Sequence, residues 1–370
     1  MKVPFFDYKG YCKDIDYKKL LEEVLDTGFL IGGPFIDQVE EKIQDLSKIK
    51  NCVCLGNATD GLEIIFDFLN LPLNSKVLVP AHTMLATASA AKSAGLIPEP
   101  VDVDPTTYML EFDQLIQCDL NNVSAIMVTQ LNGVVADMNP IRKFCDKNNI
   151  FLIEDSAQGI GAFNEDKHAG SWGIGGCLSF YPAKIIGCLG DGGAIITNSD
   201  ELADFARSVR DHGRGKELEA INWGRNSRLD NLNARVILER LDMLEALINK
   251  RRLIANIYYE TLYILEEEGV MNLPPKFSTN SNSQSTFQNY EVRAHSRDEL
   301  INFLKKKEIS TIKQWGGFSI AHFSKLGFNI SNYPATEELF NNLLLLPMNH
   351  LMNEEDAKYV AKSVLSFYRD

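Results

Sequence analysis

Apolar and amphipathic stretches alternate along the first two thirds of the chain. Short runs that are apolar at nearly every position are typical of strands buried on both faces of a sheet, and they occupy residues 51–57, 76–80, 123–131, 150–157, 177–181 and 193–198. Between them, apolar residues recur at helical spacing over residues 59–69, 84–95, 140–149 and 199–213. Because strands and helices alternate, the pattern predicts an α/β fold with a mainly parallel sheet covered by helices.

The last third of the chain follows a different pattern. One long helical stretch, rich in Leu, Ile, Arg and Glu, runs over residues 230–262 and is typical of a connection between two domains. The polar, proline-bearing stretch 272–289 is expected to form a loop. Further elements are expected as a strand at 290–294, a helix at 296–308 and a helix at 353–369. We therefore predict a large domain over residues 1–245, which includes the N-terminal segment, and a small α+β domain over residues 246–370.

Charge and composition narrow the classes of function. The formal net charge is −13 and the pI is about 5.0, which argues against a nucleic-acid binder because such proteins usually carry a basic face. No apolar run approaches the roughly 18 residues of a membrane span, and the first residues lack the apolar core of a signal peptide, so we expect a cytoplasmic protein without membrane contact. The 7 cysteines are odd in number and lack zinc spacing, so neither a disulfide framework nor a metal site is expected.

One lysine stands out among the apolar strands. In residues 179–193, "SFYPAKIIGCLGDGG", Lys184 lies between a short aromatic strand and a glycine-dense loop. A lysine in a mostly apolar stretch costs free energy unless it is paired or used, so Lys184 either reaches solvent at the strand end or takes part in chemistry. The glycines allow the backbone to pass close to a ligand. The loop matches neither the dinucleotide-binding fingerprint nor the P-loop.

A second candidate is a carboxylate at the end of another strand. Asp155, in "IEDSAQGIGA", would point into the crevice where α/β proteins bind ligands. Glu154 would face the opposite side of the sheet, because side chains alternate along a strand. An acid in this place can serve as a metal ligand, a base, a partner for a cationic ring nitrogen or a helix cap. The residues alone leave these roles open.

Two helix starts also carry polar residues. Thr59 and Asp60 stand at the strand-to-helix turn "GNATDGLE", where exposed N–H groups and the helix dipole suit a phosphate, although such pairs are also common caps. Asn226 precedes another helix in "WGRNSRLDNLNA", where caps and surface ion pairs are the ordinary roles. Together with Ser179, Asp155 and Lys184, these helix starts would supply a phosphate cradle, a carboxylate and a lysine. Pyridoxal 5′-phosphate (PLP) needs this set: a lysine for the Schiff base, an acid for the pyridinium nitrogen and a phosphate cup.

The same segments resemble a known family. Over nearly its whole length the chain is similar to the DegT/StrS-type nucleotide-sugar aminotransferases, through "DTGFLIGGPFIDQVEEKI", "GNATDGL", "IEDSAQGIGA", "SFYPAK", "GDGGAIITN", "GRNSRLDNLNA" and "LPMN" in this order. The resemblance implies a fold-type I, aspartate-aminotransferase-like PLP enzyme, with a sheet of the seven-stranded type in its large domain. It also implies a homodimer with shared active sites.

The resemblance implies roles in cofactor binding, position by position. Lys184 matches the lysine that forms the Schiff base with PLP, and Asp155 matches the acid paired with the pyridine nitrogen. Gln158 matches the residue near the phenolic oxygen of the ring. Met84 stands where many members carry an aromatic residue that stacks on the ring, and methionine can also cover a ring face. The positions that match phosphate contacts are Thr59, the backbone of Asp60, Ser179 and, from the other subunit, Asn226.

The resemblance also implies a substrate and a reaction. Gly33 and Tyr181 lie where the family approaches the sugar nucleotide. Trp315 and His322 lie in "IKQWGGFSIAHF", where sugar discrimination is expected, but a core or interface role fits them as well. The implied reaction moves an amino group from L-glutamate to a keto group of a nucleotide-linked 6-deoxy sugar, with pyridoxamine phosphate as the intermediate form of the cofactor. The motifs around Lys184 favour amination at C3 over C4, for a lipopolysaccharide or another glycosylated product.

Two alternatives share this fold. One is a PLP-dependent sugar dehydratase, but dehydratases of the family carry histidine in place of the lysine, so Lys184 argues against it. The other is a non-catalytic protein that binds PLP or a sugar nucleotide as a sensor. The presence of Lys184, Asp155 and Gln158 together weighs against that alternative.

Overall fold

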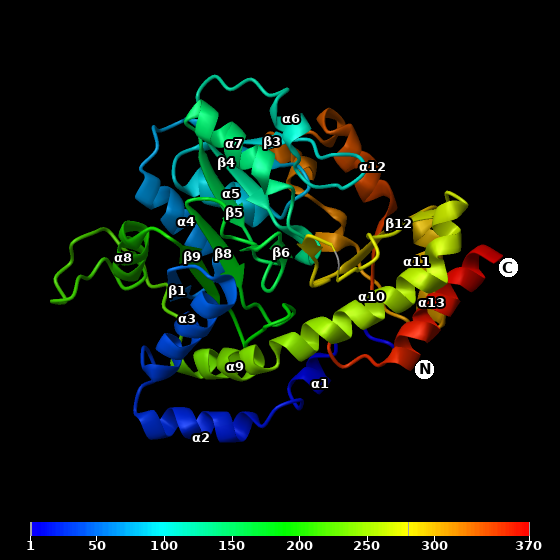
Figure 1. Cartoon of the computed structure of the whole chain (residues 1–370), viewed down its shortest axis with the longest axis horizontal. Coiled ribbons are helices and arrows are strands. Elements are labelled where there is room, and N and C mark those ends of the chain that lie inside the picture. Colours follow the sequence, from blue (N-terminus) through cyan, green and yellow to red (C-terminus); the bar gives the residue numbers. More distant parts are fainter. Residues whose placement is uncertain (1, 280, 370) are drawn as a thin grey trace.

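A seven-stranded sheet forms the centre of the computed structural model (Figure 1). The structure describes residues 2–279 and 281–369. Residues 1, 280 and 370, which belong to the ends of the predicted domains and to the predicted loop, lie outside the described residues. The strands of the sheet are β1 (Asn51–Leu55), β2 (Lys76–Pro80), β3 (Ile97–Val101), β4 (Val123–Thr129), β5 (Phe151–Asp155), β8 (Gly175–Ser179) and β9 (Gly193–Thr197).

The order of the strands across the sheet is β1-β9-β8-β5-β4-β2-β3. β9 runs antiparallel to both of its neighbours, and the remaining neighbours pair in parallel. This confirms the predicted α/β fold with a mainly parallel sheet. Because β1, β2, β4, β5 and β8 share one direction, their carboxyl ends meet at one edge, where open α/β sheets bind ligands.

Both faces of the sheet are covered, which explains why its strands are apolar at consecutive positions. In β1, Cys52 and Cys54 pack into one hydrophobic cluster, and Val53 and Leu55 pack into another. The sequence pattern did not predict the edge strand β3, because two of its five residues are proline. An edge position tolerates proline, since β3 pairs with β2 on one side only.

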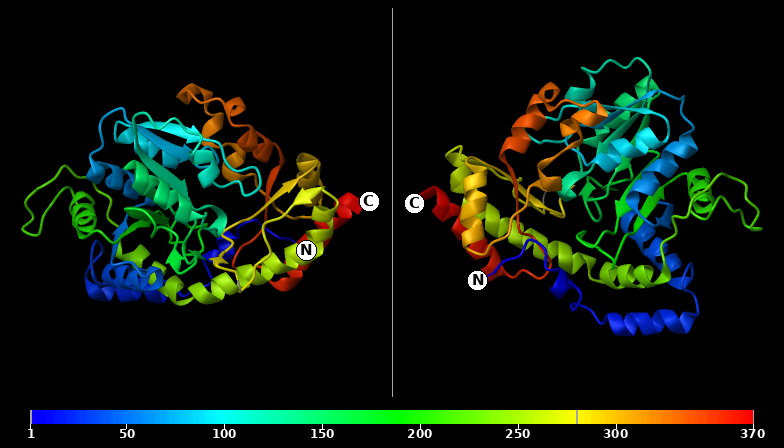
Figure 2. Two further views of the ribbon diagram at one scale, coloured as in Figure 1. Left: turned by 45° about the horizontal axis from the view of Figure 1, so that its top comes forward. Right: turned by 180° about the vertical axis from the view of Figure 1, so that it is seen from behind.

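Helices form the two covering layers (Figures 1 and 2). One face packs against α4 (Ala58–Leu69), α5 (Leu85–Ser93) and α8 (Asp200–Val209). The other packs against α3 (Pro34–Ser47), α7 (Met138–Asn148) and α9 (Asn231–Asp242). Shorter or peripheral elements are α1 (Tyr8–Tyr11), α2 (Tyr17–Thr27), α6 (Phe112–Leu115), β6 (Phe163–Asn164), β7 (Lys167–His168), β11 (Ser283–Gln284), and the 3₁₀ turns η1 (Leu131–Gly133), η2 (Gln314–Gly317), η3 (Ile320–His322), η4 (Ser324–Leu326) and η5 (Ile330–Asn332). The sequence pattern did not predict α2 and α3, which precede the first apolar strand.

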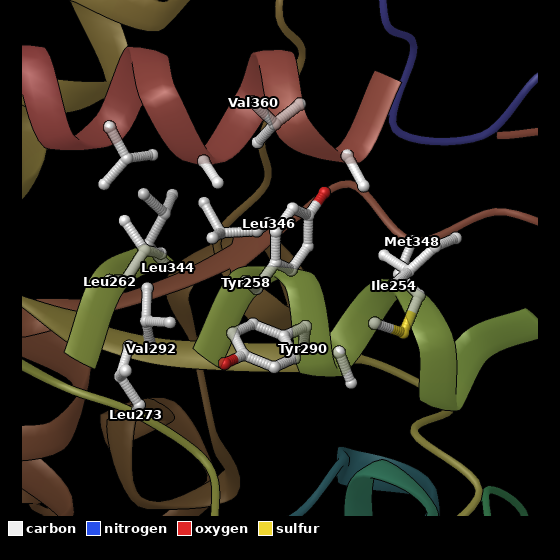
Figure 3. Packing of buried hydrophobic residues seen from close by; sticks show 14 of the residues in the cluster. Ile254, Tyr258, Leu262, Leu273, Tyr290, Val292, Leu344, Leu346, Met348 and Val360 are labelled. Atoms are coloured by element: carbon white, nitrogen blue, oxygen red, sulfur yellow. The ribbon is translucent and has the colours of Figure 1, made fainter. Parts of the chain in front are cut away.

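A second hydrophobic core lies in the last third of the chain. Its elements are α10 (Leu244–Glu267), β10 (Met271–Asn272), β12 (Tyr290–Ala294), α11 (Arg297–Lys306), β13 (Leu343–Leu346) and α13 (Glu354–Arg369). The helix α12 (Pro334–Asn342) packs instead in a small separate cluster with Val103 and Tyr108. The strands form an antiparallel sheet in the order β10-β12-β13, and α10 packs along α13. Figure 3 shows Tyr258 and Leu262 of α10 between Val292 of β12 and Val360 of α13.

The predicted helix over residues 230–262 is two helices, α9 and α10. The two helices separate at Met243. The N–H of Met243 donates to the carbonyl of Arg240, three residues back rather than four, so the backbone forms a tighter 3₁₀-type turn there. Ile248 of α10 still packs in a cluster beside the central sheet, whereas Ile254 packs in the second core. The predicted boundary between residues 245 and 246 therefore falls inside α10, and the division into two domains stays a prediction.

The N-terminal segment joins the second core as well. Val3 is buried among its residues and pairs with Ile309 as an isolated parallel bridge. The carbonyl of Pro4 accepts a hydrogen bond from Asn349 Nδ2 at 3.0 Å. Both ends of the chain thus contribute to one core. Within residues 2–279 and 281–369, no helix has the length and the apolar character that crossing a membrane requires.

Candidate active site

A cavity of about 1110 Å³ opens at the carboxyl edge of the central sheet. Its lining comes from the ends of β4, β5 and β8, from the start of α4, from the N-terminal segment and from residues between 310 and 316. The predicted site residues that line it are Thr59, Met84, Asp155, Gln158, Ser179, Tyr181, Lys184 and Trp315. The fold therefore brings most of the predicted residues to one place.

Lys184 lies in the turn after β8, and Gln288 holds that turn from both sides. Gln288 Nε2 donates to the carbonyl of Ala183 at 3.0 Å, and the N–H of Ile185 donates to Gln288 Oε1 at 3.0 Å. Burial lowers the pKa of Lys184 to about 8, and the negative charge of Asp155 opposes this shift. Lys184 is therefore neutral more often than an ordinary lysine at neutral pH, and the neutral amine is the form that attacks a carbonyl.

Asp155 is the last residue of β5 and is only 6% exposed. Its Oδ2 accepts a hydrogen bond from Thr87 Oγ1 at 2.7 Å, and its Oδ1 accepts one from the N–H of Ala157 at 3.2 Å. Glu154 points to the opposite side of the sheet, where it is fully buried and accepts a hydrogen bond from Gln130 Nε2 at 2.7 Å. The predicted alternation is confirmed, and of these two carboxylates Asp155 is the one that lines the cavity.

The start of α4 forms one corner of the cavity. Asn57 is the N-cap of this helix, and its Oδ1 accepts a hydrogen bond from the N–H of Asp60 at 2.8 Å. Asn57, Ala58 and Thr59 line the cavity, so the positive end of the helix dipole faces it. The carboxylate of Asp60 accepts from Asn57 Nδ2 at 3.0 Å, and its N–H is taken by Asn57, so the predicted phosphate contact of the Asp60 backbone stays a prediction. Asn57 is not among the predicted site residues. Asparagine is nevertheless a typical N-cap residue, because its side-chain oxygen can accept a hydrogen bond from an N–H in the first turn of the helix.

Gln158 is oriented by a network of amides. Its Oε1 accepts hydrogen bonds from the N–H of Asn132 at 2.8 Å and from Asn289 Nδ2 at 3.4 Å. Asn132 Nδ2 in turn donates to Glu291 Oε2 at 3.0 Å, and Asn132 Oδ1 accepts from Asn289 Nδ2 at 2.9 Å. Because the oxygen of Gln158 is occupied, its NH₂ group is left to donate into the cavity. The partners come from distant parts of the chain, so no local pattern could identify them.

An aromatic pair and a half-exposed methionine contribute to the remaining lining. The hydroxyls of Tyr8 and Tyr181 share a hydrogen bond, and burial together with this bond raises the pKa of Tyr8. Met84 is 51% exposed and lines the cavity. Trp315 packs against the ring of His82 at a centroid distance of 5.5 Å. Tyr8 is not among the predicted site residues, because the N-terminal segment reaches the cavity only through contacts with distant residues.

Four predicted residues do not line the cavity: Asp60, whose contacts are given above, and Gly33, His322 and Asn226. Gly33 is the N-cap of α3 with φ 105°, and a Cβ there would lie 2.8 Å from Cβ of Phe29. His322 packs on Phe340 at a ring distance of 5.0 Å, and burial lowers its pKa. Asn226 pairs with Asp211, just after α8, as an isolated antiparallel bridge, and its Oδ1 accepts from Arg228 Nε at 3.2 Å. The chain between Asp211 and Asn226 projects from the body of the molecule beside α8, on the left of Figure 1. Their proposed contacts with ligands stay predictions.

Known proteins are similar to this chain in sequence and in architecture. A pleiotropic regulatory protein of Geobacillus stearothermophilus is 32% identical over 100% of this chain and 99% of its own length. The UDP-2-acetamido-2-deoxy-3-oxo-D-glucuronate aminotransferase of Pseudomonas aeruginosa is 30% identical over 98% of this chain and 99% of its own. The crystal structure of DesV from S. venezuelae, in complex with a ketimine intermediate, superposes with a TM-score of 0.93 at 26% identity, covering 100% of this chain and 99% of that one.

The residues of the cavity fit PLP. A partly neutral lysine, a buried carboxylate and a helix N-terminus stand together in one cavity, as the aldehyde, ring nitrogen and phosphate of PLP require. The sequence model of the DegT/DnrJ/EryC1/StrS aminotransferase family matches residues 12–365. The chain therefore belongs to the DegT/DnrJ/EryC1/StrS aminotransferase family, whose members depend on PLP.

Proposed function

We propose that this protein transfers an amino group from L-glutamate to a keto group of a nucleotide-linked sugar, with C3 of a 6-deoxy sugar as the favoured position. The observation that carries the proposal is that Lys184 lines the same cavity as the buried carboxylate of Asp155. The 3-oxo group in the name of the Pseudomonas aeruginosa relative supports amination at C3. The substrate of that relative is a glucuronate rather than a 6-deoxy sugar, so both kinds of sugar belong in the test.

Each residue of the cavity has a proposed task. When bound, PLP supplies an electron-accepting ring that stabilises the charge left on the α-carbon of the donor. Lys184 binds the cofactor and moves the proton between the reacting carbons, for which an amine with a lowered pKa is suited. Asp155 holds a proton on the ring nitrogen. Gln158 donates to the phenolic oxygen, while Thr59, Ser179 and the start of α4 bind the phosphate.

The test is one absorbance titration of the enzyme loaded with PLP. L-Glutamate is expected to convert the cofactor to its amine form and to remove the visible band. The band should return when a 3-keto nucleotide sugar is added, and 4-keto sugars and 3-keto glucuronates serve as comparisons. Return with a 4-keto sugar alone would overturn the preference for C3. If glutamate leaves the band unchanged, the proposed donor is wrong.

A second candidate function is a regulatory, non-catalytic role. The name of the Geobacillus stearothermophilus relative favours it, since that protein is called a pleiotropic regulatory protein. Such a protein would bind PLP or a sugar nucleotide without turnover. The same titration separates the two functions, because a sensor does not exchange amino groups with any donor and acceptor pair. A sugar dehydratase is disfavoured by the lysine at position 184.

We also propose that the protein works as a homodimer with shared active sites. The segment that contains Asn226 carries large exposed apolar side chains, with Leu218 74%, Ile221 64% and Trp223 98% exposed. Such a surface is expected to be covered by a partner. Mixing inactive Lys184→Ala and Asn226→Ala variants tests the sharing, because a mixed dimer would contain one intact site. Recovery of activity supports shared sites, and no recovery contradicts them.

A further inference from the structure

Three threonine hydroxyls form a buried chain that ends on Asp155. Thr87 Oγ1 donates to Asp155 Oδ2 at 2.7 Å. Thr83 Oγ1 lies 2.7 Å from Thr87 Oγ1 and 3.0 Å from Thr129 Oγ1. The exposed fractions are 0% for Thr83 and Thr87 and 7% for Thr129. The chain therefore runs through the protein interior, where hydrogen bonds are stronger than in water.

The fold itself brings these hydroxyls together. Thr129 ends β4 and pairs in register with Asp155 at the end of the neighbouring strand β5. Thr83 follows β2, the other neighbour of β4, and Thr87 lies in the first turn of α5. Thr83, Thr129 and Asp155 line the cavity, whereas Thr87 lies behind them.

The direction of the chain follows from proton counting. An ionised carboxylate can only accept, so the single hydroxyl proton of Thr87 is committed to Asp155. Thr83 must then donate to Thr87, because Thr87 has no second proton to give. By the same argument Thr129 donates to Thr83. All three hydroxyl dipoles then point toward the carboxylate.

We propose that Thr87 is a positioning residue that keeps Asp155 ionised and its Oδ1 free for the ring nitrogen of the cofactor. The proposal rests on the function proposed above. Thr87 occupies Oδ2, and the N–H of Ala157 contacts Oδ1 at 3.2 Å, which leaves a lone pair of Oδ1 to accept from the ring nitrogen. Without the hydroxyl of Thr87, a buried carboxylate oxygen would lose its donor. Asp155 would then compete with the ring nitrogen for the proton.

The matched variants are Thr87→Val, which keeps the shape of the side chain and removes the hydroxyl, and Thr87→Ser, which keeps the hydroxyl. The readout is the ¹⁵N NMR shift of the ring nitrogen in enzyme loaded with ¹⁵N-labelled PLP, which reports whether that nitrogen carries a proton. We expect wild type and Thr87→Ser to keep the protonated shift, and Thr87→Val to move toward the unprotonated value. We also expect kcat/KM to fall about tenfold or more in Thr87→Val and to be largely rescued in Thr87→Ser.

The outcomes separate this proposal from the proposed function. A protonated shift in Thr87→Val, equal to that of wild type, would overturn the role of Thr87 even if transamination is established. Failure of wild type itself to bind PLP or to respond to glutamate would instead count against the proposed function. If Thr87→Val does not fold, Thr129→Val carries the test from the far end of the chain. It should move the ring shift in the same direction by a smaller amount, and an unchanged shift would overturn the proposal.

Discussion

The cavity has two sides that are built in different ways. What we call the sheet side consists of Thr59, Asp155, Ser179 and Lys184, which all stand at or just beyond the carboxyl ends of strands in one sheet. What we call the terminal side consists of Phe5, Tyr8, Lys313 and Trp315, which come from the N-terminal segment and from the last third of the chain. The sheet side carries the groups that PLP chemistry needs. The terminal side carries aromatic and polar groups that can distinguish one sugar from another.

The largest expected effect comes from removing the reactive amine of the sheet side. We expect Lys184→Ala to lower turnover by about 10³-fold or more, because the variant loses the amine that both binds the cofactor and moves the proton. PLP should still bind, since Asp155 and the start of α4 are unchanged. Steady-state rates and dialysis-resistant PLP content measure the two parts. Full turnover by this variant would contradict the division of tasks between the two sides.

The second prediction concerns the pH at which Lys184 becomes reactive. A pKa of about 8 means that roughly a tenth of the amine is neutral at pH 7, which is more than a hundredfold above a lysine at the ordinary value of 10.5. Competitive acetylation of the cofactor-free enzyme, read by mass spectrometry across pH 6–11, should give a midpoint near 8 for Lys184. Asp155→Asn should move the midpoint lower, because the charge of Asp155 raises the pKa of Lys184. A midpoint near 10.5 would show that burial does not act on this amine.

The difference between the two sides also explains what the sequence could predict. Residues of the sheet side follow apolar strands, so the strand pattern located Asp155 and Lys184, and alternation separated Asp155 from Glu154. Most of the sheet and of its covering helices could be predicted for the same reason, since apolar period and length are local properties, but the edge strand β3 and the helix α3 were missed. The contact between Thr87 and Asp155 is visible only in the tertiary structure, because the two residues lie on different elements. A threonine within a helical sequence does not indicate which residue its hydroxyl will contact.

Elements of the terminal side show why the rest could not be predicted. The strand β13 has the sequence LLLL, a run too short to distinguish a buried strand from part of a helix. Trp315 has φ 49° inside a 3₁₀ turn, a backbone state that the sequence does not indicate for a tryptophan. Tyr8 reaches the cavity only because the N-terminal segment joins the second core through Val3. These positions depend on contacts between residues that are distant in the sequence. The spacing of apolar residues along the chain does not indicate such contacts.

The third prediction tests a residue that connects the two sides. Gln288 belongs to the segment before β12 and bonds to the backbone on both sides of Lys184. We expect Gln288→Ala to lower kcat/KM about tenfold and the free energy of unfolding by about 1–3 kcal/mol, because two buried backbone groups lose their partner. Gln284→Ala is the matched control, since Gln284 lies in the same segment and donates to exposed carbonyls away from the cavity. Equal effects from both variants would contradict a specific role of Gln288 at Lys184.

The smallest expected effect lies on the terminal side itself. Tyr8→Phe keeps the ring in the cavity and removes the hydroxyl that bonds to Tyr181. If this side binds the sugar, KM for the acceptor sugar should rise about two- to tenfold, which corresponds to one hydrogen bond, while the half-reaction with glutamate keeps its rate. Tyr181→Phe should have a similar effect because it removes the same bond, and Tyr263→Phe, on the exposed part of α10, should have none. Equal slowing of both half-reactions by Tyr8→Phe would mean that the hydroxyl acts on the cofactor as well. The division of the cavity into two sides would then have to be abandoned.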